Sequence, residues 1–391
     1  MKLKILSSIV FFLVLESLYS QNVNIYSDFP TGNILIEKIK NDSIWVRPDL
    51  RDTEGDWFYW CFAVDNAKGK TLSFLLPNLN KLTAKGPAVS YDSGYTWEWL
   101  FPDTLSFRSE SFQFSFESNK EVRFSMGMPY SQSRFQTFIE KYSSNPSLSL
   151  DTLTLTEENR PIEKVIIRPK NKAEYKVLIT ARHHACEMMA NYVIEGMIDE
   201  ILMNKKLGSN IEYCFIPFID IDGVENGDQG KNRLPRDHNR DYSGEAVYNS
   251  TIKLKEWFPE WSQNMTTICI DIHCPWIRGD GNEHIYLPGS QFSEMAEEQS
   301  KFSRHLTQTN SGELKVSNNL IYPFGYGWNT HQNNSKGFSF SKWVSTFEHV
   351  KLGTSIEFPY GVNVKQTITQ QNASNFGRDF IKAVNEYLYN E

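Results

Sequence analysis

Long apolar runs are scarce in this chain of 391 residues. Beyond the first twenty residues no stretch approaches the ~20 consecutive apolar residues that a membrane-spanning helix needs. Clusters of basic residues are also missing, and the formal net charge is -7. A general affinity for nucleic acid would need a clustered basic face, so we expect neither a stable membrane span nor a nucleic-acid partner. Internal repeats and low-complexity segments are absent as well.

Cysteine is also sparse, with five residues at irregular spacings. This number is too small for a disulfide framework, and an odd count leaves at least one thiol free. Cys214 and Cys269 lie inside apolar runs, which is typical of core positions. Cys186 and Cys274 each adjoin a candidate metal ligand described below. These two could pair as a disulfide or remain thiols, and neither is counted as a ligand.

The N-terminus has the order of features found in a secretory signal peptide. Lys2 and Lys4 precede an apolar run over residues 5–15, and small or polar residues follow at 17–21. This order predicts a cleaved leader over residues 1–20 and export to the periplasm or the medium. A buried N-terminal helix is the alternative reading.

Residues 21–142 have the pattern of a smaller all-β sandwich domain. Short runs rich in aromatic and β-branched residues alternate with turn residues, and no long helical segment separates them. The expected strands are Asn33–Ile39, Ser43–Val46, Trp57–Val64, Thr71–Leu76, Ser106–Phe116 and Glu121–Met126. A linking helix is expected over Ser131–Tyr142, and the polar stretch Ser143–Asp151 is interpreted as a connector.

Residues 143–391 instead predict a larger α/β domain, because strand-like and helix-like segments alternate. We expect a mixed, mostly parallel sheet flanked by helices. The expected strands are Val165–Ile167, Tyr175–Thr180, Ile211–Ile219, Ile268–Ile272 and Thr354–Phe358. The expected helices are Glu187–Met203, Phe292–Leu306 and Asn372–Tyr389.

Two of these strands end at residues that bind zinc well. His184 and Glu187 form an H-x-x-E pair at a strand-to-helix turn, and His273 closes a later apolar strand. Two histidines, one carboxylate and an open fourth position make a typical catalytic zinc site. A hydrogen-bonded core histidine is the alternative for His273 taken alone. Neither H-E-x-x-H nor H-x-x-E-H occurs, which excludes the zinc proteases that carry their ligands on one helix.

Two further features could supply chemistry. The loop from Lys231 to Arg240 is dense in arginine, and guanidinium groups bind carboxylates in a two-pronged fashion. A purely structural loop is the alternative. Glu357 lies in a strongly apolar strand, where an unpaired acid is costly and its pKa is raised toward the range of a general base.

Taken in order, these pieces resemble the zinc carboxypeptidase (peptidase M14) family, and especially its branch related to cytosolic carboxypeptidases. The pattern covers residues 150–391: H-x-x-E, a D-G-V turn, an arginine, D-x-N-R, D-x-H and a late glutamate. That branch also carries an N-terminal β-sandwich, which the stretches 86–100 and 124–130 resemble.

The resemblance implies a role for each matching residue in hydrolysis of the C-terminal peptide bond of peptides or proteins. His184, Glu187 and His273 would hold one zinc ion per chain, and Glu357 would be the general base. Arg233 would stabilise the developing oxyanion. The substrate's terminal carboxylate would be clamped by Asn239 and Arg240. Asp237 would support a zinc-binding histidine.

The sequence departs from the family pattern in some places. The middle residue of D-x-N-R is His238, and Arg236 competes with Arg233 for the oxyanion role. No tyrosine clearly matches the one that caps the substrate in the family, with Tyr322 and Tyr326 as weak possibilities. Lys342 is the only charged residue in the expected specificity segment 338–343. If Lys342 lines the pocket, acidic C-terminal residues would be preferred.

Two other functions use the same residues. The sandwich could bind glycan or protein beside a vestigial zinc domain, which would predict a missing ligand or base. The zinc domain could instead deacylate a small amide, with the arginines reading a different carboxylate. The sequence makes no prediction of the oligomeric state.

Overall fold

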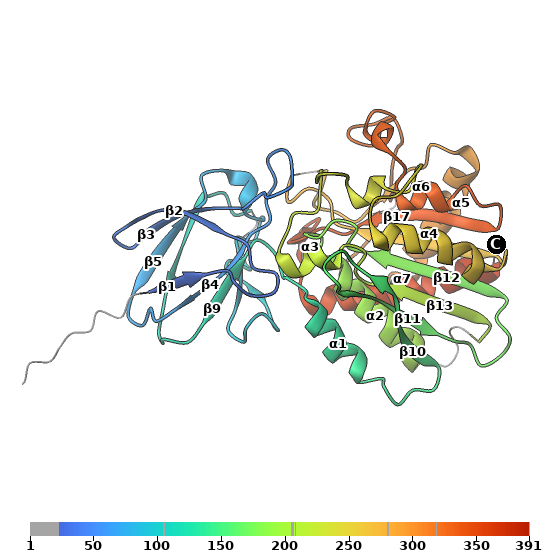
Figure 1. Cartoon of the computed structure of the whole chain (residues 1–391), viewed down its shortest axis with the longest axis horizontal. Coiled ribbons are helices and arrows are strands. Elements are labelled where there is room, and N and C mark those ends of the chain that lie inside the picture. Colours follow the sequence, from blue (N-terminus) through green and yellow to red (C-terminus); the bar gives the residue numbers. More distant parts are fainter. Residues whose placement is uncertain are drawn as a thin grey trace, which may run out of the picture.

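The computed structural model describes residues 23–104, 106–204, 207, 209–279, 281–317 and 319–390. The leader expected over residues 1–20 lies outside the described residues. A smaller strand-rich body, on the left in Figure 1, adjoins a larger body of strands and helices. Among the described helices, none is both long and apolar enough to cross a membrane.

The N-terminal body consists of two sheets that pack face to face. One has the order β1-β4-β9-β6-β7 and the other the order β2-β3-β5-β8. Ring centroids of Phe62 and Phe124 in the first sheet lie 5.0–5.5 Å from that of Phe74 in the second, so aromatic side chains fill the space between them. The expected sandwich is confirmed. Its strands are β1 (Asn24–Tyr26), β2 (Leu35–Lys40), β3 (Ser43–Arg47), β4 (Cys61–Asp65), β5 (Thr71–Leu75), β6 (Ala88–Ser90), β7 (Glu98–Trp99), β8 (Ser111–Ser115) and β9 (Val122–Ser125).

Helix α1 (Gln132–Glu140) follows the sandwich, as expected. It begins where the Ser131 hydroxyl accepts a hydrogen bond from the backbone N–H of Arg134, which is typical N-capping. The connector predicted over Ser143–Asp151 is partly wrong. Residues 148–151 belong to β10 (Leu148–Leu155), an edge strand with many polar and exposed residues.

The larger body is built on a six-stranded sheet with the order β10-β11-β13-β12-β14-β17. The four strands from β13 to β17 run parallel, and β10 and β11 (Pro161–Ile167) pair antiparallel at one edge. Every residue of β14 (Thr267–His273) is buried. Successive side chains point to opposite faces, so both faces of the sheet are covered. This confirms the expected mixed, mostly parallel sheet, whose other strands are β12 (Tyr175–Ala181), β13 (Ile211–Ile216) and β17 (Val350–Glu357).

Helices α2 (Met189–Met203) and α5 (Ser293–Thr309) both pack against α7 (Gln370–Asn390). The contact between α2 and α7 depends on glycine, because a Cβ at Gly196 would lie 1.8 Å from the carbonyl oxygen of Ser374. Helix α4 (Asn249–Ser262), which the sequence did not predict, packs against the short α6 (Phe340–Val344) through Phe258 and Trp343. The remaining elements are α3 (Ile221–Asn226), η1 (Leu79–Lys81), η2 (His238–Arg240), η3 (Asn333–Lys336), β15 (Leu287–Pro288), β16 (Ile321–Tyr322), β18 (Val362–Asn363) and β19 (Gln366–Thr367).

The sandwich is joined to the larger body by polar contacts as well as packing. The buried amide of Gln229 accepts from the Tyr59 backbone N–H at 2.7 Å and donates to the Tyr59 carbonyl oxygen at 2.8 Å. Arg51 donates to the Asp228 carboxylate at 2.6 Å. These contacts hold the loop after α3 against residues 50–60 of the sandwich.

All five cysteines are free thiols, so no disulfide joins Cys186 and Cys274 in this structure.

Candidate active site

Three neighbouring parallel strands deliver the candidate residues to one edge of the sheet. Strand β12 leads directly to His184 and Glu187, β14 ends at His273, and β17 ends at Glu357. In the register of β14 and β17, His273 lies opposite Glu357. Because the carboxyl ends of parallel strands meet at one edge, residues distant in sequence converge there.

A strained turn places His184 and Glu187 after β12. Arg182 has φ of 59°, in the left-handed region that non-glycine residues rarely adopt. Its buried guanidinium holds the turn by donating to the Ala185 carbonyl oxygen at 2.9 Å and to the Asn191 side chain at 2.7 Å. The turn therefore aims His184 into the cleft and starts α2 just beyond Glu187.

His184, Glu187 and His273 converge with their donor atoms within 4.8 Å of one another. Glu187 bridges the two rings: its Oε1 lies 3.0 Å from His184 Nδ1 and its Oε2 lies 2.6 Å from His273 Nδ1. Glu187 and His273 are buried and His184 is half-buried. Two imidazole nitrogens and a carboxylate are a donor set that suits zinc, so the residues fit the expected metal.

The other nitrogen of each ring is held by an aspartate. His184 Nε2 lies 3.2 Å from Asp237 Oδ1, and His273 Nε2 lies 2.6 Å from Asp271 Oδ2. Each Nε2–H can donate to its aspartate, which leaves the Nδ1 lone pair available to a metal. The structure therefore places Asp237 where the sequence expected it, and adds Asp271 as its counterpart.

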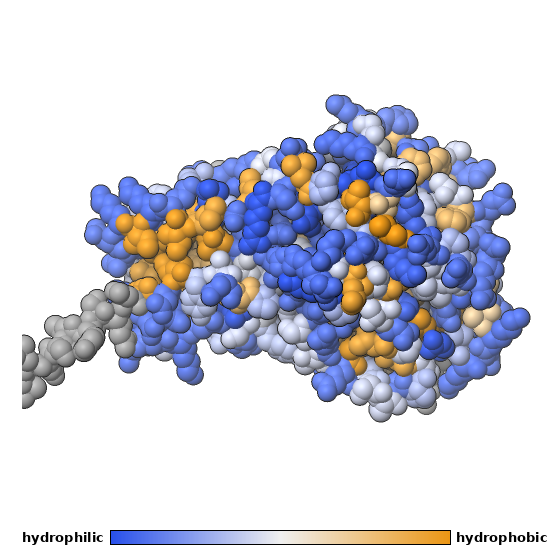
Figure 2. Space-filling model, in the orientation of Figure 1, coloured by the Kyte–Doolittle hydropathy of each residue, from blue (hydrophilic) through white to orange (hydrophobic). Residues whose placement is uncertain are grey.

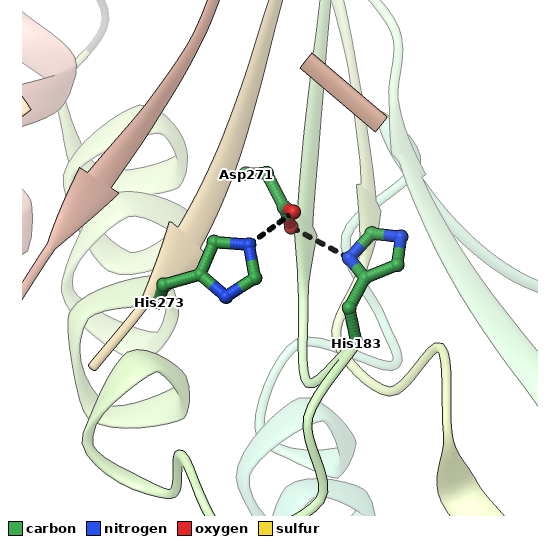
Figure 3. A group of neighbouring side chains, drawn as sticks. All are labelled: His183, Asp271 and His273. Atoms are coloured by element: carbon green, nitrogen blue, oxygen red, sulfur yellow. Dashed lines mark hydrogen bonds and ion pairs between the residues drawn. The ribbon is translucent and has the colours of Figure 1, made fainter. Parts of the chain in front are cut away.

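Asp271 also links His273 to a second histidine, as Figure 3 shows. Its Oδ1 lies 2.8 Å from His183 Nδ1, and His183 Nε2 lies 2.7 Å from the Tyr242 hydroxyl. His183, Asp271 and His273 could in principle group around a metal too. Each nitrogen facing Asp271 is already engaged by it, so we interpret this group as a hydrogen-bonded chain that fixes the His273 ring.

Both supporting aspartates remain ionised. Burial alone would raise the pKa of the Asp237 carboxyl, but His184 and a backbone N–H hydrogen bond lower it well below its usual range. The pKa of Asp271 is also lowered, since His183 and His273 outweigh its burial. A charged acceptor strengthens each hydrogen bond to the imidazole and makes the ring a better ligand.

Glu357 combines burial with an unused oxygen. It is 8% exposed, and within the described part of the chain its Oε2 has no hydrogen-bond partner. Burial is the main reason that the pKa of this carboxyl is raised, and the nearby Glu187 adds to the effect. A carboxylate of this kind, lining a cleft beside a metal-binding group, can accept a proton from water.

The cleft has a volume of about 430 Å³ and is lined by His184, Glu187, His273 and Glu357. The expected clamp residues Asn239 and Arg240 line it as well. Arg240 is steadied by its Nη1, which donates to the Asn239 carbonyl oxygen at 2.7 Å. Asn239 Oδ1 accepts from the Phe340 backbone N–H at 3.0 Å. A guanidinium and an amide thus share one wall near the metal-binding group.

The oxyanion role expected for Arg233 does not fit its position. Arg233 is not one of the described residues that line the cleft. Its guanidinium is engaged by the carboxylates of Asp52, Asp220 and Asp228 at the junction with the sandwich. Arg236, the competing arginine, donates to the Asp241 carboxylate at 2.9 Å and to the Glu245 carbonyl oxygen at 2.7 Å, and it does not line the cleft either.

Several residues that line the cleft were not predicted from the sequence, and three of them bear on its chemistry. Lys231 lies beside Glu187. Trp57 reaches the cleft from the sandwich, and its ring centroid lies 5.2 Å from that of Trp276. Tyr286 lies opposite Glu357 in an isolated bridge and also lines the cleft, whereas Tyr322 and Tyr326 are outside its described lining. The only sequence signal for Lys231 was its position in the basic loop, two residues before Arg233.

Lys342 does line the cleft. Its Nζ lies 4.2 Å from the centroid of the Phe338 ring, and Ser339 caps the short helix α6 that carries it. Burial and the neighbouring Arg240 lower the pKa of its ammonium group. The sequence predicted a preference for acidic C-terminal residues on the condition that Lys342 lines the pocket, and this condition is met.

The sequence profile of the zinc carboxypeptidase family matches residues 136–389, which is most of the chain. The chain belongs to the zinc carboxypeptidase family. Cytosolic carboxypeptidase 3 of Bos taurus is 24% identical over 298 residues, and that of Mus musculus is 25% identical over 283. These matches cover 64% and 61% of this chain, but only 28% and 27% of the relatives.

Solved structures of bacterial carboxypeptidases share the fold over almost the whole chain. The metallo-carboxypeptidase of Burkholderia cenocepacia has a TM-score of 0.76 at 18% identity, covering 94% of this chain and 99% of that one. The metallo-carboxypeptidase of Pseudomonas aeruginosa, in complex with (2-guanidinoethylmercapto)succinic acid, has a TM-score of 0.73 at 19% identity, covering 93% and 99%. The likeness therefore extends to the combination of sandwich and α/β body.

Proposed function

We propose that this protein is a zinc-dependent carboxypeptidase that removes the C-terminal residue of peptides or proteins. The observation that carries the proposal is the buried Glu357 oxygen, which has no hydrogen-bond partner among the described residues and lines the same cleft as the ligand group and Arg240. A base, a metal-binding group and a carboxylate clamp are the three parts that such a reaction requires. Family membership supports the same activity.

His184 and His273 would hold the metal through Nδ1, and Glu187 through its carboxylate. Zinc bound there would supply Lewis acidity, polarising the scissile carbonyl and lowering the pKa of water. The paired aspartates keep both rings oriented for this task, because Asp237 and Asp271 engage the opposite nitrogens.

Glu357 would transfer the proton. As the water oxygen attacks the carbonyl carbon, its proton passes to the Glu357 carboxylate. When the C–N bond breaks, the same proton moves to the leaving amine nitrogen, so the base is regenerated. The products are a shortened peptide with a new carboxylate and a free amino acid.

Arg240 and Asn239 would make the enzyme an exopeptidase. A substrate with a free C-terminal carboxylate can bind the Arg240 guanidinium in a two-pronged fashion. An internal peptide bond offers no carboxylate at that position, and the cationic group would be left buried against a neutral chain. The clamp therefore selects chain ends.

Lys342 would favour an acidic side chain on the residue that is removed. Its ammonium group lines the cleft close to Arg240 and the Phe338 ring. Lys336 adds a second positive charge to the lining. A glutamate or aspartate side chain would gain opposite charges there, whereas a lysine side chain would be repelled.

The test compares two peptides that end in glutamate and differ only in a free or an amidated C-terminus. We expect release of glutamate from the free peptide by the zinc-loaded protein. Release of glutamate α-amide from the amidated peptide should be at least ~100-fold slower, because this peptide loses the charged contact to Arg240. Equal rates would contradict the clamp. Hydrolysis of small N-acyl substrates without trimming of either peptide would favour the amide deacylase instead.

A further inference from the structure

Lys231 places a cation beside the metal-binding group. Its ammonium nitrogen lies 2.5 Å from Glu187 Oε1 and donates to the Cys274 carbonyl oxygen at 3.2 Å. The Trp57 ring covers it, with the nitrogen 5.5 Å from the ring centroid. The side chain is 13% exposed and lines the cleft that also contains Glu357.

The backbone before Lys231 is built to bring it there. Gly230 has φ of 73°, and a Cβ at this position would lie 2.2 Å from the Ala185 backbone nitrogen. The neighbouring Gln229 carbonyl oxygen accepts from the Cys186 backbone N–H at 3.1 Å. Residues 229–231 are therefore pressed against the turn that carries His184, and the next side chain enters the cleft.

Donor counting shows that Lys231 retains capacity for a substrate. An ammonium group has three N–H donors. Among the described residues, two acceptors engage them: the Glu187 carboxylate and the Cys274 carbonyl. One donor therefore remains for an oxygen atom in the cleft. Arg233 has no comparable freedom, because three carboxylates surround its guanidinium.

We propose that Lys231 stabilises the negative charge that develops on the carbonyl oxygen during peptide hydrolysis, the role that the sequence assigned to Arg233. This inference rests on the proposed carboxypeptidase function. As water attacks the carbonyl carbon and gives its proton to Glu357, the π electron pair moves onto the carbonyl oxygen, which accepts a hydrogen bond from Lys231. When that pair re-forms the C=O bond, the C–N bond breaks and the amine takes the proton from Glu357.

Lys231 keeps its own proton throughout, so it acts as an electrophile and not as an acid. A preorganised cation in a partly dry cleft is worth more than the same charge in water. An ammonium is a compact point charge, whereas a guanidinium is a planar fork, so substitution by arginine should restore charge but not the fit.

The experiment compares wild type, Lys231→Met, Lys231→Arg and the surface control Lys253→Met, all reconstituted with zinc. Lys253 is 46% exposed and pairs with Glu256 on α4. Four quantities are measured: zinc per chain, kcat, KM, and the affinity for two inhibitors. The inhibitors are a phosphonate peptide, whose tetrahedral anionic group resembles the transition state, and benzylsuccinic acid, whose carboxylates are planar and do not mimic the attacked carbonyl.

We expect Lys231→Met to keep about one zinc per chain, to lose about 10²- to 10³-fold in kcat, and to change KM by less than about threefold. Phosphonate affinity should fall in parallel with kcat, while benzylsuccinic acid should bind almost as before. Lys231→Arg should recover part of the kcat, and Lys253→Met should match wild type.

Other outcomes would overturn the inference in distinguishable ways. Loss of zinc from Lys231→Met would make Lys231 a structural partner of Glu187. Unchanged kcat and phosphonate affinity would refute the role while leaving the carboxypeptidase intact. A zinc-loaded wild type that trims no peptide would overturn the proposed function, and the role of Lys231 with it.

Discussion

Replacing Arg233 by methionine should cost stability and not chemistry. Its guanidinium is 11% exposed and is the shared partner of three carboxylates that join the sandwich to the α/β body. Removing one partner of a buried ion pair typically costs about 3–5 kcal/mol, because the remaining charge is left without compensation.

The structure indicates where that cost falls. The Asp52 side chain is 31% exposed, so water can solvate its carboxylate. Asp228 would retain its ion pair with Arg51 at 2.6 Å. Asp220 is 2% exposed, and within the described ranges its carboxylate would retain the Gly223 N–H at 3.0 Å and the more distant His238 at 3.8 Å. We therefore expect the lower end of the range, about 3 kcal/mol, with most of it arising at Asp220.

Urea denaturation of the zinc-loaded protein measures this loss, with Arg47→Met as the control. Arg47 makes an exposed pair with Glu37, which should contribute less than about 1 kcal/mol. Asp220→Asn in the Arg233→Met background should recover part of the loss, because the unpaired charge is removed. A loss no larger than that of the control, together with a fall in kcat at full zinc content, would refute this reasoning and return Arg233 to the cleft.

Two further predictions concern specificity and pH. Lys342→Glu should lower kcat/KM for a glutamate-terminated peptide by about 10- to 100-fold and raise it for a lysine-terminated one. If the ratio of these two kcat/KM values is the same in the variant as in wild type, the charge contact is contradicted. Burial and the nearby Asp220 raise the pKa of the Asp228 carboxyl to about 6 despite its arginine partners. Because the folded protein binds this proton more tightly than the unfolded chain, stability relative to Asp228→Asn should fall by up to ~3 kcal/mol as pH rises from about 4 to about 6. A difference between the two urea midpoints that is independent of pH would count against this cause.

Much of the site could be predicted because it depends on strand ends. His184, His273 and Glu357 each end an apolar segment with the length and composition of a buried strand. The carboxyl ends of parallel strands share one edge, so their proximity follows from the fold class alone. The H-x-x-E segment precedes α2 as a turn, in which the Glu187 backbone N–H donates to the His184 carbonyl oxygen at 3.2 Å.

The choice between Lys231 and Arg233 could not be made in the same way. Both lie in a loop without periodicity, and their directions depend on a tertiary contact: the close approach of Gly230 to the Ala185 backbone. The arrival of Trp57 in the cleft likewise depends on how the sandwich docks. Spacing within the sequence carries no information about either contact.

Among the elements that the sequence did not predict, β10 and α4 were missed for local reasons. Strand β10 has many serine and threonine residues and few buried positions, so its composition is that of a connector until its pairing with β11 is known. Helix α4 contains Pro259 and three aromatic residues, which weaken its helical pattern. Packing of Phe258 against Trp343 stabilises it instead.

The most direct test of zinc-dependent trimming is to measure zinc content and release of C-terminal residues together, for wild type and Glu357→Gln. With Glu357 as the general base, we expect about one zinc per chain in both proteins, release of single C-terminal residues by wild type, and a fall in kcat of at least ~10³-fold in the variant. Absence of zinc from the wild type, or equal trimming by Glu357→Gln, would contradict this mechanism.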